Sequence, residues 1–337
     1  MELELKKYVL QLSHTFKISR ESRDEQDSLV VCLSLNGKTG YGEATANPYY
    51  NATVESMIAE ILEVESEIKA LTTIDPESFY KLLTDKGLSY FAKCALDLAA
   101  HDLYGKLKDK PLYKLWGTSN AHYPITNYTI GIDTVEKMVE KMLEKPWPLY
   151  KIKLRTDYDL EIVKALREHT SAVFRIDANN AWSVAQTIEL APLLKELNVE
   201  FLEQPLHADN IEGYKALKGK CALPIMADES CIVEEDVVQC AGLFDGVNIK
   251  LTKCGGLTPA LRMIKQAKSL NMKVMVGCMT ESTVGISAIA QLTPQLDYVD
   301  MDGAMLLKED IASGIEILEG GILKFPTLGG SGVRLLK

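Results

Sequence analysis

"YKIKLRTDYDLEIVKALREH" (residues 150–169) joins a short apolar strand to an amphipathic helix. A strand followed by a helix is one βα unit, the repeating element of parallel α/β folds. Within the strand, Lys151 and Lys153 alternate with apolar residues, so both side chains point to the same face. Lysine is rarely buried without a partner. The two lysines therefore predict a site that uses positive charge.

The same unit recurs along the chain from about residue 121. The apolar segments that we expect to form strands are PITNYTI, YKIKL, VFRID, VEFLEQ, PIMADE, GVNIKL, KVMVGC and YVDMDG. Eight βα units close into a TIM barrel. We therefore predict an α/β fold whose main part is a modified (β/α)8 TIM barrel over residues 119–312.

The N-terminal region has a different pattern. Residues 1–118 begin with strand-like segments such as SLVVCLSLN and continue into helical ones such as SYFAKCALDLAAHDLYGKL. A run of strands followed by helices is typical of an α+β domain, here predicted to cap the barrel. Residues 313–337 are expected to return to this capping domain.

Charge and composition exclude several classes of partner. A net charge of −10 with scattered lysines and arginines offers no basic stripe for nucleic acid. No apolar run approaches the about 20 residues that a membrane helix needs, and MELELKKYVL lacks the apolar core of a signal peptide. Seven cysteines without a C-x-x-C pair suit reduced thiols. We expect a cytoplasmic protein with no membrane partner.

Charged residues stand where the predicted strands end, and TIM-barrel active sites lie at the carboxyl ends of the strands. In chain order they are Lys151, Lys153, Asp177, Glu203, Asp228, Glu229, Lys250, Asp300 and Asp302. Their spacing is one βα unit from strand to strand, so we expect them to surround one mouth of the barrel.

Three of these residues, Asp177, Glu203 and Asp228, are carboxylates on consecutive strands. Bare carboxylates would repel one another in a pocket of low dielectric constant. A divalent cation with oxygen ligands removes that repulsion, and open octahedral positions for a substrate favour Mg²⁺. Alternatively, each acid only caps the helix after its strand. Three acids in register beside two lysine-bearing strands favour the metal site.

The lysines on the second and sixth predicted strands, Lys153 and Lys250, should reach the cavity from opposite sides. A lysine near a divalent cation and another lysine has a lowered pKa and can act as a base. Two bases on opposite faces of a carbon racemise or epimerise it. We expect Lys151 to lower the pKa of Lys153 and to hold a substrate carboxylate. A Schiff base at Lys250 is an alternative, but it gives the three acids no role.

Five motifs together resemble the muconate-lactonizing-enzyme subgroup of the enolase superfamily, and the likeness covers essentially the whole chain, including GYGEA in the capping domain. They are KIK (151–153), DANNAW (177–182), EQP (203–205), ADES (227–230) and NIKLTKCGG (248–256). The mandelate-racemase branch uses a histidine on the seventh strand. The last histidine here, His207, follows the fourth predicted strand, which excludes that branch.

The resemblance implies a mechanism in which Mg²⁺ and a lysine base form and stabilise an enediolate. It implies that the Mg²⁺ ligands are Asp177, Glu203 and Asp228, that Lys153 and Lys250 are the acid/base pair, and that Asn179 and Glu229 are supporting polar groups.

Asp300 and Asp302 form a D-x-D pair on the last predicted strand. The pair resembles the signature of dipeptide epimerases, in which it holds the free α-ammonium of the substrate. This implies an isomerase that inverts the α-carbon of the C-terminal residue of an Ala-Xaa dipeptide. The alternatives are a cycloisomerase or dehydratase of the same subgroup, of the muconate cycloisomerase or o-succinylbenzoate synthase type, and a catalytically silent barrel used for binding or assembly. A silent barrel would be expected to have lost a metal ligand or a lysine, and none is missing here.

Side-chain preference is expected to depend on the loop at 14–27, which closes over the site in the family. An ungapped match places Glu21, flanked by Arg20 and Arg23, where Ala-Glu epimerases have an arginine. We therefore expect a hydrophobic or broad Xaa, with Ala-Glu possible and the facing residue left open among these three. The further predicted substrate contacts are Thr129, Met279 and Thr280. LGGSG (328–332) is read as a surface turn, and a homo-oligomer is expected.

Overall fold

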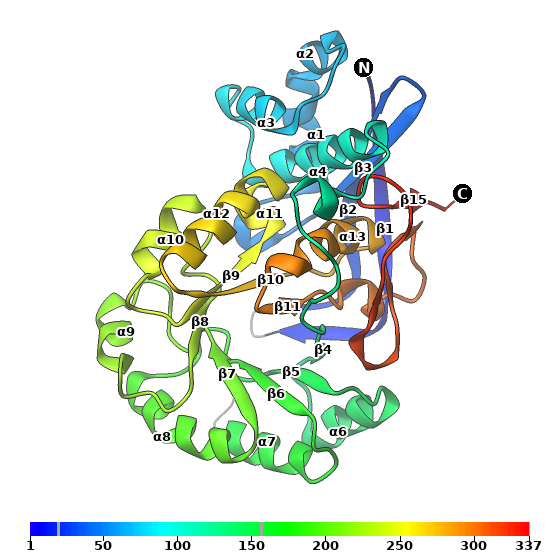
Figure 1. Cartoon of the computed structure of the whole chain (residues 1–337). Coiled ribbons are helices and arrows are strands. Elements are labelled where there is room, and N and C mark those ends of the chain that lie inside the picture. Colours follow the sequence, from blue (N-terminus) through cyan, green and yellow to red (C-terminus); the bar gives the residue numbers. More distant parts are fainter. Residues whose placement is uncertain (19–20, 156–157, 337) are drawn as a thin grey trace.

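The computed structural model describes residues 1–18, 21–155 and 158–336, with side chains 16–21 left out. Its N-terminal part is a three-stranded antiparallel sheet followed by helices (Figure 1). The elements are β1 (Glu2–Ile18), β2 (Glu21–Leu35), β3 (Lys38–Thr45), η1 (Pro48–Tyr50), α1 (Val54–Glu63), α2 (Glu65–Ala70), α3 (Pro76–Asp85), α4 (Tyr90–Leu107) and α5 (Leu112–Leu115).

Helix α4 is buried along most of its length and packs on the sheet. Two glycines of β3 allow this close approach, because a Cβ at Gly40 or Gly42 would collide with the main chain of α4. The turn between β2 and β3 has positive φ at Asn36 and Gly37, as a tight hairpin requires. Sequence and packing therefore agree on an α+β domain here.

Eight parallel strands follow in sequential order, as predicted. They are β4 (Tyr128–Ile130), β5 (Leu149–Lys153), β6 (Val173–Asp177), β7 (Val199–Glu203), β8 (Ile225–Ala227), β9 (Gly246–Lys250), β10 (Lys273–Gly277) and β11 (Tyr298–Asp300). A parallel bridge between Thr126 and Val299 joins the two ends of the sheet, which makes it a nearly closed TIM-type barrel.

Helices surround these strands (Figure 1). They are α6 (Val135–Glu144), α7 (Asp159–Arg167), α8 (Val184–Glu196), α9 (Ile211–Leu217), α10 (Glu234–Cys240), α11 (Leu251–Cys254), α12 (Leu257–Ser269) and α13 (Thr283–Leu292). Two short 3₁₀ turns flank the last strand: η2 (Thr293–Gln295) comes before it and η3 (Gly303–Leu306) after it. None of the helices in the described residues is long and apolar enough to cross a membrane.

The N-terminal sheet and the C-terminal segment both contact other parts of the chain. The hairpin of β1 and β2, in blue, reaches the barrel, where Leu12 bridges to Leu307 after η3 (Figure 1). Near the C-terminus, Ser331 is buried and donates to Asp102 of α4, so the prediction of a surface turn at 328–332 was wrong: this segment packs against the N-terminal domain. The remaining short elements are β12 (Ala312–Ser313), β13 (Glu316–Ile317), η4 (Glu319–Gly321), β14 (Leu323–Lys324) and β15 (Arg334–Leu335).

Candidate active site

The three predicted metal ligands lie side by side at the carboxyl end of the barrel. Asp177 and Glu203 are paired in register at the ends of β6 and β7, and Asp228 follows β8 directly. Their exposed fractions are 3%, 1% and 5%. Buried carboxylates require compensating charge or hydrogen bonds. The structure supplies both.

One oxygen of each of the three carboxylates accepts a hydrogen bond from a neighbouring side chain. Asn179 Nδ2 donates to Asp177 Oδ1 at 2.8 Å, and Asn248 Nδ2 donates to Glu203 Oε1 at 2.8 Å. The third partner is a lysine, because Lys253 Nζ donates to Asp228 Oδ1 at 2.6 Å. The other oxygen of each carboxylate is left to face the cavity lysines.

Lys151 lies at the centre of this cluster. Its Nζ is 2.7, 2.9 and 3.2 Å from carboxylate oxygens of Glu203, Asp300 and Asp177. Burial alone would lower the pKa of Lys151, but the three carboxylates outweigh it and raise the pKa well above its usual value. The protonated, positively charged form of Lys151 is therefore strongly favoured in this environment.

The predicted acid/base pair comes from opposite walls. Lys153 ends β5 and Lys250 ends β9, four strands further around the eight-stranded sheet. Lys153 Nζ lies 2.9 Å from Asp177 Oδ2, and Lys250 Nζ lies 2.8 Å from Asp228 Oδ2. Burial lowers the pKa of Lys250, but the ion pair with Asp228 raises it more. The lowering predicted from the sequence concerns a lysine beside a bound divalent cation, whereas here the ammonium pairs directly with the carboxylate.

The donor set fits a hard divalent cation. Burial, and then the neighbouring Asp177 and Asp228, raise the pKa of Glu203 to about 7 in spite of Lys151. Lys151 Nζ is close to Glu203 Oε2, but no described donor points at this oxygen with hydrogen-bond geometry. Burial also raises the pKa of Asp177 and Asp228, but nearby lysines outweigh it and lower both pKa values, so Glu203 alone of the three keeps a raised pKa. Carboxylate oxygens are the ligands that Mg²⁺ takes in proteins, and a cation there would favour the ionised form of Glu203. The residues therefore suit the predicted metal.

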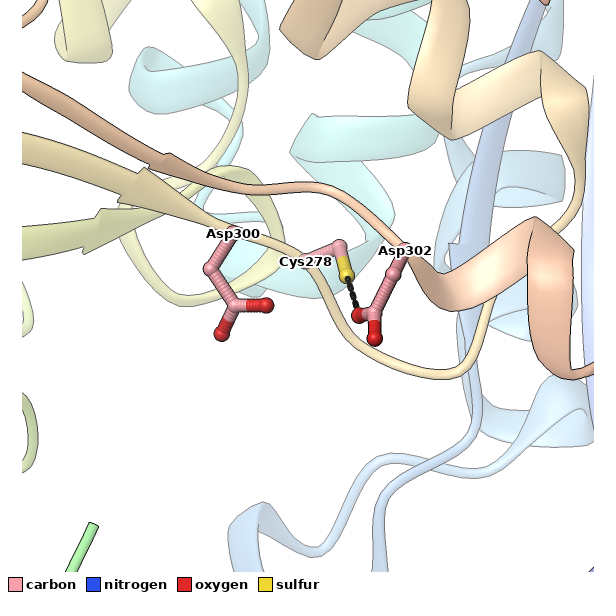
Figure 2. Close-up of side chains that lie close together, drawn as sticks. All are labelled: Cys278, Asp300 and Asp302. Atoms are coloured by element: carbon pink, nitrogen blue, oxygen red, sulfur yellow. Dashed lines mark hydrogen bonds between the residues drawn. The ribbon is translucent and has the colours of Figure 1, made fainter. Parts of the chain in front are cut away.

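Asp300 and Asp302 form a second acidic group, next to Cys278 (Figure 2). One ligand atom from each residue lies within 4.8 Å of the others. Asp300 is neutralised by Lys151, whereas Asp302 accepts from Thr129 N at 2.6 Å and lies 4.0 Å from the Cys278 sulfur. Burial and the neighbouring Asp300 raise the pKa of Asp302 to about 7. This end of the site favours a positively charged group.

A cavity of about 480 Å³ connects these groups. The predicted residues that line it are Thr129, Lys151, Lys153, Asp177, Asn179, Asp228, Glu229, Lys250, Met279, Thr280, Asp300 and Asp302. Glu203 is not among the described residues that line the cavity, but it pairs with Lys151, which is. The N-terminal domain adds Arg23, Asn47, Tyr49 and Tyr50 to the wall.

Three residues of the 14–27 loop were predicted to face the substrate side chain, and the structure describes the side chain of only one of them. Arg20 lies outside the described residues, and so does the side chain of Glu21. Arg23 lines the cavity. An arginine therefore lines the site, and the match that places Glu21 opposite the substrate side chain stays a prediction.

Two structural contributors to the site were missed in the sequence. Lys253 was quoted within NIKLTKCGG but given no role, although a lysine three residues after Lys250 was a signal of a second charge there. Tyr50 also lines the cavity, and burial raises its pKa to about 12. Its position depends on the contact between the two domains, which no local pattern reveals.

A TIM-type barrel with an N-terminal capping domain and charged groups at the strand ends is the architecture of acid–base enzymes of the enolase type. Residues 4–117 match the model of the mandelate racemase / muconate lactonizing enzyme N-terminal domain, and residues 133–337 match the enolase C-terminal domain-like model. The chain belongs to the mandelate racemase / muconate lactonizing enzyme family of the enolase superfamily.

Relatives of known name cover the whole chain. An L-Ala-D/L-amino acid epimerase of Maribacter sp. is 66% identical over 99% of both chains. One of Flavobacterium johnsoniae is 56% identical over 100% of both. The crystal structure of a dipeptide epimerase from Cytophaga hutchinsonii, complexed with Mg and the dipeptide D-Ala-L-Val, is 28% identical and has a TM-score of 0.92. The match covers 99% of this chain and 95% of that one.

Proposed function

We propose that the protein is an isomerase that inverts the α-carbon of the C-terminal residue of Ala-Xaa dipeptides. The observation that carries this proposal is one cavity with lysines on opposite walls and an acidic pair at its end. The lysines suit proton transfer at both faces of a carbon, and the acidic pair suits the free ammonium group of a dipeptide. Full-length relatives that bear an epimerase name support the same reading.

Asp177, Glu203 and Asp228 would hold Mg²⁺ in this enzyme. When bound there, the metal would stabilise the negative charge that develops on the substrate carboxylate as the α-proton leaves. Lys151 would place a further fixed positive charge beside that carboxylate, since its Nζ already lies among three carboxylate oxygens. A positive charge that is already in position lowers the activation barrier, because the site does not have to reorganise as negative charge develops on the substrate.

Proton transfer would involve the Nζ atoms of Lys153 and Lys250. One neutral amine removes the α-proton from one face, and the other residue, as an ammonium, delivers a proton to the opposite face. The base must first separate from Asp177 or Asp228, with which it is now paired. Because the reaction is symmetric in this respect, either lysine serves as the base, depending on which epimer binds.

The substrate ammonium would bind Asp302 and Asp300. Asp302 has no described cationic partner, whereas Asp300 already pairs with Lys151. A cycloisomerase substrate without an ammonium group would leave Asp302 buried and uncompensated. This favours the dipeptide over the alternative substrates of the subgroup.

The side chain of Xaa would meet a mixed wall. Tyr49, Tyr50, Met279 and Leu306 offer aromatic and apolar surface, and Arg23 offers a positive charge. This wall suits hydrophobic residues and allows an acidic one. Cytoplasmic location and association into a homo-oligomer stay predictions.

A library of L-Ala-L-Xaa dipeptides tests the proposal. Each dipeptide is incubated with the protein and Mg²⁺, and NMR follows the growth of L-Ala-D-Xaa signals toward an equilibrium mixture. We expect conversion of several dipeptides, and none with Lys153→Ala or Lys250→Ala. No conversion of any dipeptide by the wild type would overturn the proposal and turn attention to cycloisomerase substrates.

A further inference from the structure

We propose that Lys253 is a positioning residue that orients Asp228 for binding of the divalent cation. The inference rests on the proposed metal site, and it concerns a lysine that neither touches the substrate cavity nor belongs to the acid/base pair. Among the described residues that line the cavity, Lys250 is present and Lys253 is not.

Lys253 is buried in α11, the short helix after β9, with an exposed fraction of 1%. Its Nζ donates to Asp228 Oδ1 at 2.6 Å, to the main-chain oxygen of Asp228 at 2.6 Å, and to Cys231 O at 3.3 Å. An ammonium group has three donors, and all three are used. Because two of them hold the main chain and side chain of the same residue, rotation of the Asp228 carboxylate is blocked.

The three proposed metal ligands share one arrangement. Asn179 fixes one oxygen of Asp177, Asn248 fixes one oxygen of Glu203, and Lys253 fixes one oxygen of Asp228. In each case the other oxygen faces a lysine at the cavity. Lys253 thus occupies the place that an amide takes at the other two ligands, which assigns it the same orienting task.

The local chain geometry holds Lys253 rigidly. Gly255 and Gly256 have φ values of 101° and 125°, which side-chain-bearing residues rarely adopt. A Cβ at Gly256 would collide with the carboxylate of Asp97 in α4. The start of α12 is tied to the same residue, because Thr258 N donates to Asp97 at 2.9 Å. Lys253 therefore extends from a turn that is fixed against the N-terminal domain.

Two effects of Lys253 on a bound cation have opposite signs. Its positive charge repels the cation, so its removal alone would strengthen binding. Its hydrogen bonds hold the ligand in place, and loss of a group that orients a metal ligand typically weakens binding by about 10–100-fold. The amide groups at the other two ligands orient them without charge, so the structure uses the orienting hydrogen bond at all three ligands and the positive charge at only one. We expect weaker binding when Lys253 is replaced.

Titration of the full-length protein with Mn²⁺, followed by electron paramagnetic resonance of the free ion, measures this directly. We expect Lys253→Met to weaken Mn²⁺ binding by about 10–100-fold. Lys253→Gln restores an amide donor without charge and should recover part of the affinity. Lys93→Met is the matched control, because Lys93 is also buried, at 6% exposure, but its Nζ lies over the rings of Tyr90 and Tyr80.

Circular dichroism establishes whether each variant is folded. If Lys253→Met is not folded, the Mn²⁺ affinity of Lys253→Gln is compared with that of the wild type, and we expect it to be weaker. Unchanged or tighter Mn²⁺ binding in the Lys253 variants would overturn the inference and leave the proposed function intact. A loss equal to that of Lys93→Met would also overturn it. Wild-type protein that binds no Mn²⁺ would overturn the proposed metal site, and this inference with it.

Discussion

Glu43 of β3 and Ser282 before α13 join the N-terminal domain to the barrel through a buried hydrogen bond of 2.6 Å between Glu43 Oε2 and Ser282 Oγ. The same carboxylate accepts from the main-chain nitrogens of Ser282 and Gly285. It therefore lies at the N-terminus of α13, where a negative charge is favoured. The loop that carries Met279 and Thr280 into the cavity ends at this contact.

Replacing Glu43 by alanine should destabilise the protein. The change leaves buried donors on Ser28, Ser282 and Gly285 without an acceptor, which costs on the order of 3 kcal/mol of unfolding free energy. Urea denaturation measures it. Glu25→Ala removes an exposed glutamate of the same sheet and should change stability by less than about 0.5 kcal/mol. Equal effects of the two changes would contradict the structural role of Glu43.

Stability should fall as the pH rises from 6.5 to 8, partly because of Asp97. Burial raises the pKa of Asp97 to about 7, above its ordinary value, so the folded state holds this proton where the unfolded state has lost it. Unfolding free energy therefore decreases with rising pH up to and through about 7, by on the order of 1 kcal/mol between pH 6.5 and 8. Burial lowers the pKa of the adjacent His101 from 6.5 to about 3, so its contribution to stability rises with pH until the unfolded imidazole has lost its proton. Most of that rise lies below pH 6.5, and the remainder opposes the effect of Asp97 without reversing it.

The measurement compares urea denaturation at the two pH values for the wild type and Asp97→Asn. In Asp97→Asn the decrease in unfolding free energy between the two pH values should be smaller by the contribution of Asp97. Part of the decrease should remain, because other buried acids of the active site still titrate. A pH dependence identical to that of the wild type would contradict the assignment. The absolute stability of the variant does not matter for this comparison.

Mg²⁺ should stabilise the folded protein. A ligand present at 100 times its dissociation constant adds about 2.7 kcal/mol if it binds only the folded state. We expect a higher melting temperature with Mg²⁺ than with EDTA, and no such increment in Glu203→Gln. Asp297→Asn is the control, because Asp297 precedes β11 at the opposite end of the barrel and pairs with Lys273. An increment that survives in Glu203→Gln would place the ion elsewhere.

Asp302→Asn should weaken the binding of dipeptides with a free ammonium group. We expect KM to rise tenfold or more, a change of about 1.4 kcal/mol, since a buried acceptor charge is lost. The wild type should discriminate strongly against the N-acetylated dipeptide, and the variant much less. If the variant keeps the full preference for the free ammonium, Asp302 does not recognise it.

The sequence predicted the barrel because its βα units are local, periodic and separated by turn residues. It also placed Asp177, Glu203 and Asp228 on neighbouring strands, and the spacing by one unit was sufficient for that. The roles of Lys253 and Glu43 were not predicted, because their partners lie 25 and 239 residues away and are set by packing between elements. The raised pKa of Lys250 also depends on a distance that spacing alone does not fix.

Lys153 and Lys250 are proposed to serve opposite faces of one carbon, and single-lysine variants in D₂O test this arrangement. NMR follows exchange of the α-proton of Xaa in L-Ala-L-Xaa and in L-Ala-D-Xaa, with Mg²⁺. We expect that Lys153→Ala exchanges this proton in one epimer only, that Lys250→Ala does so in the other epimer only, and that neither variant inverts the centre. Exchange of the same epimer by both variants, or inversion by either, would contradict it.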